Sequence, residues 1–160
     1  MNLFFTQEGY FKKITPLSLR MGGEQKLKEG DAIVHQLEST NAAELLFFSD
    51  RAQVYKTRAA DFADTKASVM GEYIPARLQM DEGETAAAMA VTTDYSGFML
   101  FVFENGKVAK VELSAYSTKT NRRKLLNAYS DKSPLVAALQ LPEDCDVLLT
   151  ASSGRMLLFN

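Results

Sequence analysis

His35 and Cys145 are the single histidine and the single cysteine of the 160-residue chain. A serine or cysteine nucleophile would therefore depend on His35 as its general base. His35 lies in an apolar segment with strand character, residues 32–37, where a histidine at the edge of a core is expected. Cys145 follows the sequence Pro-Glu-Asp, which predicts a loop thiol without a role.

Metal and nucleotide sites also lack their usual residue patterns. Zinc sites need two or more Cys or His at short spacing, which one residue of each type does not supply. There is neither a Walker loop nor a Rossmann glycine fingerprint. The acidic residues 81–84 lack the further oxygen ligands of a calcium loop and predict an acidic turn. We expect no cofactor, no metal and no enzyme activity in this chain.

The composition is that of a foldable, soluble domain, with 46% hydrophobic and 24% charged residues. No apolar run approaches the roughly 20 residues of a membrane-spanning helix. The first residues lack the basic start and apolar core of a signal peptide, and a single cysteine suits a reducing compartment, so a cytoplasmic protein is expected. The net charge of −2 argues at first sight against a nucleic-acid binder.

Four segments of the chain repeat one pattern of strand, tight polar turn and second strand. The aligned turn residues are Gly9, Ala52, Gly106 and Gly154, at intervals of 43, 54 and 48 residues. An apolar residue precedes each of them by five positions: Phe4, Phe47, Phe101 and Leu149. Asn105-Gly106 is a strong hairpin signal because both residues tolerate positive φ. The pattern predicts four β-hairpins.

A second element recurs between the hairpins, where a turn precedes a short apolar segment. It begins near residues 32, 85 and 135. The alanine-rich residues 85–91 have high helix propensity, but their place in the repeat favours a strand over a short helix. The sequence therefore predicts an all-β, propeller-like array of blades of about 48 residues each. A blade buries both faces only when neighbours stack on it.

Three stretches carry a resemblance to a known family. They are residues 7–18 (QEGYFKKITPLS), residues 46–56 (LFFSDRAQVYK) and residues 104–116 (ENGKVAKVELSAY). The chain resembles the C-terminal repeat region of the A subunit of bacterial type II topoisomerases, gyrase and topoisomerase IV, over nearly its whole length. The resemblance implies a β-pinwheel, in which neighbouring blades exchange strands.

We expect one repeat domain over residues 1–160, made of three blades and one further hairpin. The approximate blades are residues 1–44, 45–96 and 97–145, and residues 146–160 begin or close another. The family's domain usually has more blades than this, so we expect the chain to be a piece of a longer polypeptide.

The resemblance also implies a non-catalytic function. Such a domain binds double-stranded DNA without sequence preference along a basic outer rim, and bends or wraps it for strand passage. The cleavage tyrosine, and the use of ATP and Mg²⁺, belong to other parts of the parent enzyme. The implied partners are DNA, the ATPase B subunit and the rest of the A subunit, without a membrane, in the bacterial cytoplasm at the nucleoid.

One departure from the family concerns the glycine- and arginine-rich box of gyrase. The corresponding residues 17–26 read LSLRMGGEQK, so Met21 and Glu24 replace basic flanks. This departure places gyrase-type wrapping in doubt and favours a protein that is topoisomerase IV-like or divergent. The stretch most similar to the box is residues 119–124 (KTNRRK).

Positive charge is concentrated in the third repeat, where residues 106–132 hold seven Lys and Arg against two Asp and Glu. The candidate DNA-binding residues there are Lys107, Lys110, Lys119, Arg122, Arg123, Lys124 and Lys132. Arg20, Lys13 and Lys56 complete the set. Lys13, Lys56 and Lys110 share one position of the repeat, which predicts either a ring of outward cations or the ordinary outward alternation of strands. Residues 119–124 could equally be a solvated loop.

Negative charge gathers instead in the second repeat. Its cluster comprises Asp81, Glu82, Glu84 and Asp94. The alternative function is accordingly a protein-interaction propeller without DNA binding, with this acidic unit as its working surface. Because charge is segregated in this way, the overall value of −2 does not exclude DNA.

Overall fold

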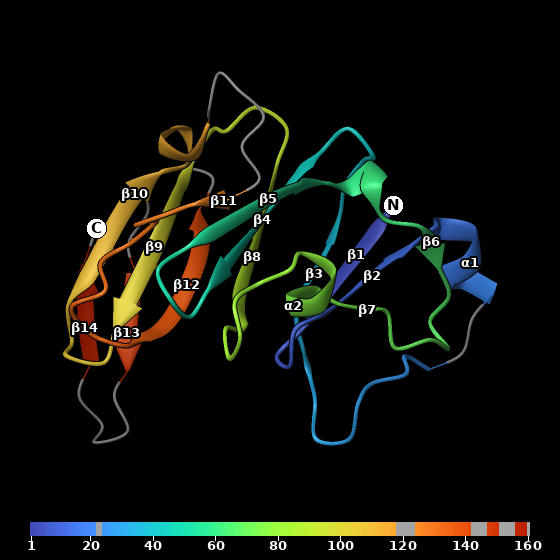
Figure 1. Ribbon diagram of the computed structural model, residues 1–160, viewed down its shortest axis with the longest axis horizontal. Coiled ribbons are helices and arrows are strands. Elements are labelled where there is room, and N and C mark those ends of the chain that lie inside the picture. The colour runs from blue at the N-terminus through green and yellow to red at the C-terminus, as the bar shows by residue number, and fades with distance from the viewer. Residues whose placement is uncertain (22–23, 118–123, 142–146, 151–155, 160) are drawn as a thin grey trace.

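The computed structural model describes residues 1–21, 24–117, 124–141, 147–150 and 156–159. These residues form four β-sheets with a few short helical segments (Figure 1). The first three sheets follow one another along the longest axis of the molecule from the N-terminal end, and the sheet of β13 and β14 overlaps the third sheet in this view. The described residues therefore form an open row of blades, and the predicted all-β, propeller-like fold is confirmed.

Each sheet is built on one of the predicted hairpins. They are β1 (Asn2–Thr6) with β2 (Tyr10–Ile14), β4 (Glu44–Ser49) with β5 (Val54–Arg58), β9 (Phe98–Phe103) with β10 (Val108–Glu112), and β13 (Val147–Thr150) with β14 (Met156–Phe159). The first three turns place Gly9, Ala52 and Gly106 at φ of 96°, 59° and 85°. The residues that the repeat aligns therefore share a left-handed backbone, although the second is an alanine.

In the first three sheets, a third strand pairs antiparallel with the first strand of the hairpin. These strands are β3 (Ile33–Glu38) on β1, β8 (Ala86–Thr92) on β4, and β12 (Leu135–Leu141) on β9. The expectation of a strand over residues 85–91 is confirmed. Each third strand also has a one-residue bulge at the same place in the repeat, at Val34, Ala87 and Val136. A bulge of this kind twists the strand and interrupts its edge.

The fourth position of the first two sheets is filled from the following repeat. β6 (Asp64–Thr65) and β7 (Glu72–Tyr73) pair with β2, and β11 (Lys124–Leu125) pairs with β5. Strand exchange between neighbouring blades is therefore present, as expected of a β-pinwheel. The first two sheets consequently depend on residues that lie two or more elements further along the chain.

The core lies between the sheets, because both faces of a blade are covered. In β4, Leu45 and Phe47 pack toward the first sheet, whereas Leu46 and Phe48 pack toward the third. All four side chains are inaccessible to solvent. This double burial explains why the strand is a continuous apolar run and does not alternate with polar residues.

Short helices follow the first three hairpins. α1 (Pro16–Met21), η1 (Ala59–Asp61) and η2 (Leu113–Tyr116) each begin seven residues after an aligned turn residue. A further helix, α2 (Ile74–Arg77), follows β7, and the buried Ile74 anchors it by donating its backbone N–H to the carbonyl of Gly9 at 2.9 Å. This anchor places α2 beside the first hairpin turn and across from β5.

Candidate nucleic-acid interface

The most basic stretch of the sequence falls mainly outside the described residues. Lys119, Arg122 and Arg123 lie there, and only Lys124 of this stretch is described, as the first residue of β11. Lys107, Lys110, Lys132 and Arg20 are exposed. The placement of these described cations is compatible with a surface that contacts phosphate.

The three exposed lysines lie on β10 and in the two loops beside the third sheet. The backbone N–H of Lys107 donates to Asn105 Oδ1 at 3.0 Å, and the N–H of Asn105 donates to Ser133 Oγ at 3.2 Å. The second bond holds the segment that bears Lys132 against the turn that bears Lys107. Lys110 lies on β10 with its amine 4.5 Å from the centre of the Phe98 ring.

Lys13 does not belong to an outward ring, and that expectation is wrong for this residue. Its side chain is 4% exposed. The amine donates to Asn41 Oδ1 at 2.8 Å and to the carbonyl of Ala59 at 2.9 Å, and lies 3.6 Å from Asp64. The face of β2 that sequence alternation assigns to solvent is covered by the second repeat, so this lysine ties two repeats together.

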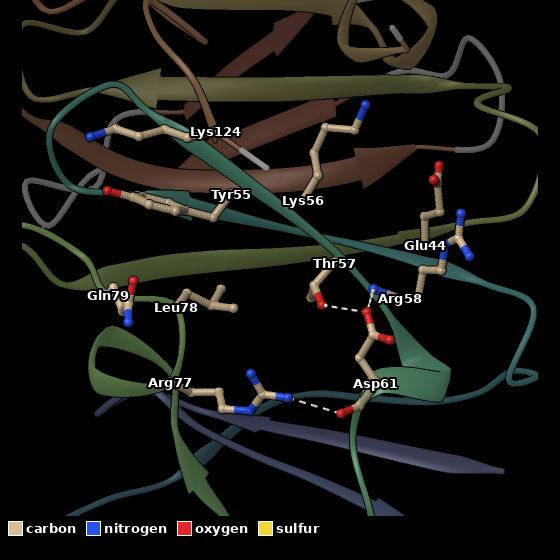
Figure 2. A pocket seen from close by; sticks show the side chains of 10 residues that line it. All are labelled: Glu44, Tyr55, Lys56, Thr57, Arg58, Asp61, Arg77, Leu78, Gln79 and Lys124. Carbon is tan, nitrogen blue, oxygen red and sulfur yellow. Dashed lines mark hydrogen bonds between the residues drawn. The ribbon is translucent and has the colours of Figure 1, made fainter. Parts of the chain in front are cut away.

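A hollow of about 580 Å³ lies beside β5 and is called here the β5 pocket (Figure 2). Its charged lining residues are Lys56, Arg58, Arg77, Lys124, Glu44 and Asp61. The predicted candidates Lys56 and Lys124 are brought together here, whereas Arg58 and Arg77 were not anticipated. The alternation of Lys56 with Arg58 on one strand was the signal that could have found Arg58.

Among the described residues, β11 pairs with Val54 and Tyr55, the first two residues of β5, at one end of the pocket. The rest of β5 runs on toward η1 beside the hollow, and α2 closes the opposite side with Arg77, Leu78 and Gln79. Three segments that are distant in the sequence thus surround one space.

Hydrogen bonds fix the side of the pocket that joins η1 to α2. Asp61 Oδ2 accepts from Thr57 Oγ1 and from the backbone N–H of Arg58, both at 3.3 Å. Arg77 donates through Nη2 to the carbonyl of Asp61 at 2.9 Å and through Nε to Glu72 at 3.0 Å. The guanidinium also lies 5.1 Å from the Phe62 ring. These contacts hold Arg77 in place at the pocket wall (Figure 2).

The opposite end of the pocket is set by an acidic turn of the second repeat. Lys124 lies 3.5 Å from Asp81 and 5.5 Å from the centre of the Tyr55 ring. Tyr55 donates its hydroxyl hydrogen to Glu84 at 2.6 Å, and Glu84 is buried. The predicted acidic turn is present, but one of its carboxylates is an internal acceptor and not a surface charge.

The charged side chains of the pocket lie beside opposite charges. Four cationic side chains and two carboxylates line it, and Arg77 and Lys124 are in addition paired with Glu72 and Asp81. Burial lowers the pKa of Lys56, and the nearby Glu44 opposes that effect in part. Glu44 is also the cross-strand neighbour of Arg58, so one of the two acids faces a cation directly.

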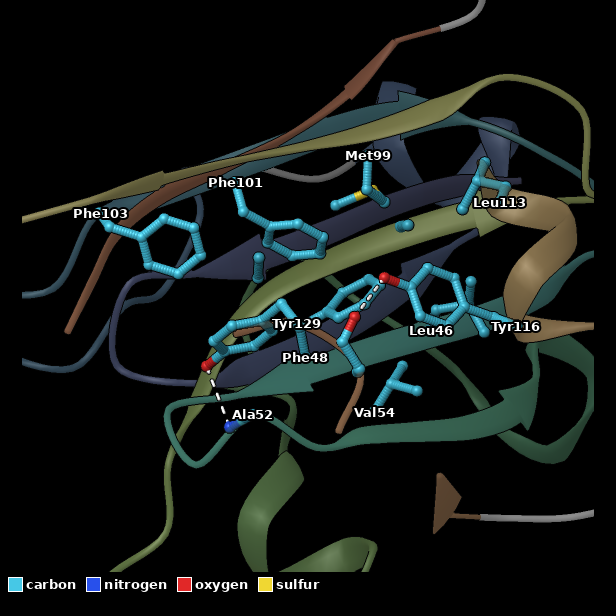
Figure 3. Close-up of a cluster of buried hydrophobic side chains, with 13 residues drawn as sticks. Leu46, Phe48, Ala52, Val54, Met99, Phe101, Phe103, Leu113, Tyr116 and Tyr129 are labelled. Carbon is cyan, nitrogen blue, oxygen red and sulfur yellow. Dashed lines mark hydrogen bonds between the residues drawn. The ribbon is translucent and has the colours of Figure 1, made fainter. Parts of the chain in front are cut away.

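Tyr129 fastens the chain segment that follows β11. Its hydroxyl donates to the carbonyl of Ser49 at 2.5 Å and accepts from the N–H of Ala52 at 3.2 Å (Figure 3). The N–H of Ala128 donates to the carbonyl of Ala52 at 2.7 Å. The turn of the second hairpin is therefore held by the third repeat, which also stabilises the position of β11.

Among the described residues, no group of three or more His, Cys, Asp or Glu side chains could hold a metal ion. His35 is half-buried beside Phe5, with ring centres 6.0 Å apart, and burial lowers its pKa. This placement is that of a histidine at the edge of the core. Cys145 lies outside the described residues.

Known proteins with similar sequences share this repeat architecture. A family model described as "DNA gyrase C-terminal domain, beta-propeller" matches residues 43–92. The A subunit of DNA gyrase from Streptomyces coelicolor is 26% identical over 170 residues, which cover 96% of this chain and 20% of that protein. The A subunit of DNA topoisomerase 4 from Bacillus subtilis is 25% identical over 125 residues, which cover 76% and 16%.

Solved structures agree with the sequence matches. The C-terminal domain of DNA topoisomerase IV superposes with a TM-score of 0.81 and 23% identity, over 99% of this chain and 51% of that one. The E. coli ParC C-terminal domain gives 0.69 and 16%, over 99% and 63%. The chain resembles the C-terminal domain of type II topoisomerase A subunits. This result confirms the resemblance that the repeat motifs indicated.

The chain spans about a fifth of the length of the curated gyrase relatives that it matches. The family model covers residues 43–92, which hold β4, β5 and β8 with the strands β6 and β7 that the first sheet receives. None of the helices in the described part of the chain is long and apolar enough to cross a membrane.

Proposed function

We propose that this chain is a non-catalytic DNA-binding domain of a type II topoisomerase, part of its A subunit, which guides duplex DNA for strand passage. The observation that carries the proposal is its similarity to such domains over nearly the whole chain, in sequence and in fold. Exposed Lys107, Lys110 and Lys132, on β10 and in the loops beside the third sheet, supply the local positive charge that a DNA backbone requires. DNA cleavage, ATP and Mg²⁺ chemistry and the B subunit then belong to the rest of the enzyme.

Binding of this kind is electrostatic and independent of sequence. Lysine amines act as compact point charges toward phosphate oxygens and release condensed counterions from the duplex. Contacts to phosphates position a protein on DNA without reading its bases. The domain therefore serves to hold and orient a segment of duplex, and bends it when several blades are engaged together.

The tyrosines of the repeats serve as packing residues in this proposal. Tyr116 is buried and donates to the carbonyl of Ala128 at 2.7 Å, and burial raises its pKa. Burial also raises the pKa of Tyr129. A tyrosine nucleophile needs access to the phosphodiester and a ready phenolate, and both conditions are unfavourable at these positions.

The altered box favours a topoisomerase IV-like role over gyrase-type wrapping. Met21 ends the exposed helix α1, and Arg20 is the single cation of that helix, with its Nε 3.4 Å from the carbonyl of Pro16. A helix that presents Leu17 and Met21 to solvent offers little charge to a wrapped duplex. DNA relaxation or decatenation by the parent enzyme is accordingly the proposed outcome.

A salt titration of duplex binding tests the proposal. The triple variant Lys107→Gln, Lys110→Gln, Lys132→Gln is compared with the matched triple Lys26→Gln, Lys28→Gln, Lys66→Gln, whose three lysines are exposed in other parts of the chain. The first variant is expected to bind more weakly, and the slope of log K against log salt falls by about 0.9 per lost phosphate contact. The second variant keeps a slope nearer that of the parent.

Two results would contradict the proposal at different levels. If the parent chain fails to bind duplex DNA at low salt, the function is wrong and a protein-interaction propeller becomes the better explanation. If the parent binds but both triple variants lose affinity equally, the assignment to the third sheet is wrong, because only total charge then matters.

A further inference from the structure

We propose that Asn105-Gly106, in the turn of the third hairpin, is a site of spontaneous deamidation, and that the carboxylate so produced weakens contact between the third repeat and DNA. The modification itself depends only on the chemistry and exposure of this turn. Its effect on DNA rests on the proposed function. The product is an aspartate or an isoaspartate in place of Asn105.

The third hairpin turn is open to solvent, unlike the first two. Residues 104–107 are all exposed, whereas Gly9 and Ala52 are buried. Segments of the following repeat cover these two turns, because β7 and α2 lie beside Gly9 and the hydroxyl of Tyr129 accepts from the N–H of Ala52. A Cβ at Gly106 would meet nothing within 4 Å. Water therefore has access to the peptide bond between Asn105 and glycine.

Hydrogen bonds direct the side-chain amide of Asn105 toward the peptide nitrogen that would attack it. Asn105 Oδ1 accepts from the backbone N–H of Lys107 at 3.0 Å, so the side chain folds forward toward the Gly106 peptide, which lies between the two bonded residues. The same bond polarises the side-chain carbonyl and stabilises negative charge on Oδ1. The N–H of Gly106 donates to the carbonyl of Phe103 at 3.0 Å, and this bond of an exposed turn must open before the nitrogen attacks.

The reaction consumes water and needs no other partner. The backbone nitrogen of Gly106 loses its proton and bonds to Cγ of Asn105, while Nδ2 takes up a proton and leaves as ammonia. Water then opens the resulting succinimide ring at either carbonyl. Opening at Cγ gives aspartate, and opening at the backbone carbonyl gives isoaspartate. Glycine favours the first step because it has no side chain to obstruct ring closure.

Two other asparagines of the described part of the chain lack this arrangement. Asn41 is followed by alanine, and its Oδ1 accepts from the buried amine of Lys13 at 2.8 Å. Asn127 is also followed by an alanine, which is buried and donates its N–H to the carbonyl of Ala52 at 2.7 Å. A side chain therefore obstructs ring closure at both positions. The chain thus contains its own internal controls.

The new carboxylate would lie among the lysines proposed to contact DNA. The turn and the segment bonded to it, residues 104–107 and 130–133, hold Lys107 and Lys132 together with Glu104 and Asp131. These charges balance, so Lys110 on β10 gives the region its positive excess. A carboxylate at position 105 cancels that excess and repels the phosphates of a duplex.

The modification is tested on the 160-residue chain, incubated folded in a mildly alkaline buffer and followed by mass-spectrometric peptide mapping and enzymatic methylation of isoaspartate. Asn105 is expected to convert well before Asn41 and Asn127. Gly106→Ala is expected to lose most of this conversion, and Asn105→Gln to lose all of it over the same time. The chain unfolded in urea supplies the rate without the turn. If Asn105 stays intact in the folded chain while the unfolded chain converts, the turn protects it and the proposal is overturned.

The effect on DNA is tested with Asn105→Asp, which carries the aspartate product from the outset. Its matched control is Gln7→Glu, which makes the same change from amide to carboxylate at an exposed position of the first repeat. Duplex affinity at low salt, measured by fluorescence anisotropy, is expected to fall several-fold more in Asn105→Asp than in the control. Equal affinities of the two variants would overturn the link between the modification and DNA contact.

These outcomes are distinct from a failure of the proposed function. If the parent chain does not bind duplex DNA, the proposed function is wrong, and peptide mapping still decides whether Asn105 converts. If the parent binds and responds to the triple variant of the third-repeat lysines, the proposed function stands whatever the result at Asn105.

Discussion

At the scale of single residues, two adjacent buried lysines of β2 differ in what surrounds the amine. Lys12 donates to the carbonyls of Lys26 and Ala67, both at 3.2 Å, and burial lowers its pKa. Lys13 has Asp64 within 3.6 Å. The first lysine therefore keeps its charge against a desolvation cost, while the second has an opposite charge to offset it.

This difference predicts a pH dependence of stability that belongs to Lys12. Because its folded pKa lies below 10.5, the unfolded chain binds the extra proton between the two values. The free energy of unfolding therefore gains a contribution that rises with pH across that interval. We expect Lys12→Met to remove this rise, measured as the difference between variant and parent in urea unfolding from about pH 7 to pH 10.

Lys13→Met is the matched control, because it removes a neighbouring buried amine of the same strand. This control loses the bonds to Asn41 and Ala59 and is expected to be less stable at every pH, yet to keep the rise due to Lys12. An unchanged rise in Lys12→Met would show that another group carries it.

A second residue-scale prediction separates backbone strain from steric clash. Gly71 and Gly106 both have positive φ, at 93° and 85°. A Cβ at Gly106 meets nothing within 4 Å, whereas a Cβ at Gly71 would lie 2.4 Å from the carbonyl oxygen of Phe11. Chemical denaturation should show that Gly106→Ala costs about 1 kcal/mol and Gly71→Ala more than about 3 kcal/mol. Equal costs would mean that strand pairing between β2 and β7 yields easily.

At the scale of elements, the hairpins could be predicted from sequence because their signals repeat. Turn residues, apolar positions and third strands recur at matching places in the repeats. The position of residues 85–91 in the repeat therefore predicted a strand correctly, although their helix propensity is high. The exchanged strands β6, β7 and β11 could not be predicted individually. Each has two residues, which is too short for a period of two to be recognised.

The candidate site was predicted wrongly at Lys13 and lacked Arg77, because the strands exchanged between repeats could not be predicted. Lys13 looks outward on an isolated amphipathic strand, but the second repeat covers that face with Ala59 and Asp64. Arg77 was not anticipated because α2 reaches β5 only through the anchoring of Ile74 at the first hairpin turn. Contacts between side chains of different repeats can be predicted only once the positions of the exchanged segments are known.

Tyr129 provides the prediction for such a crossing segment. Tyr129→Phe keeps the ring, whose centre lies 4.9 Å from that of Phe101, but deletes the bonds to Ser49 and Ala52. Two backbone groups of a buried turn lose a partner, so we expect a loss of about 1–3 kcal/mol in unfolding free energy. Tyr73→Phe, at a 42% exposed position, should change it by less than about 0.5 kcal/mol. Equal effects would mean that Tyr129 acts through packing alone.

At the scale of the whole molecule, a net charge of −2 coexists with a basic third repeat. Acidic residues of the second repeat are in part internal, as with Glu84, or paired with cations, as with Asp81 and Lys124. The charge that faces solvent therefore differs from the charge counted along the chain. If the proposed function holds, DNA contacts the basic region, while the rest of the surface limits non-specific contact.

The direction of strand exchange also has a consequence for protein synthesis. The first sheet receives β6 and β7 from the second repeat, and the second sheet receives β11 from the third. During synthesis, the second strand of the first or second hairpin, β2 or β5, therefore has an unpaired edge until the following repeat has been translated. Open edges are sites of mispairing between chains. For the first two sheets, the fold thus sets an order of assembly from the N-terminus onward, because each of them is completed by residues of the repeat that follows.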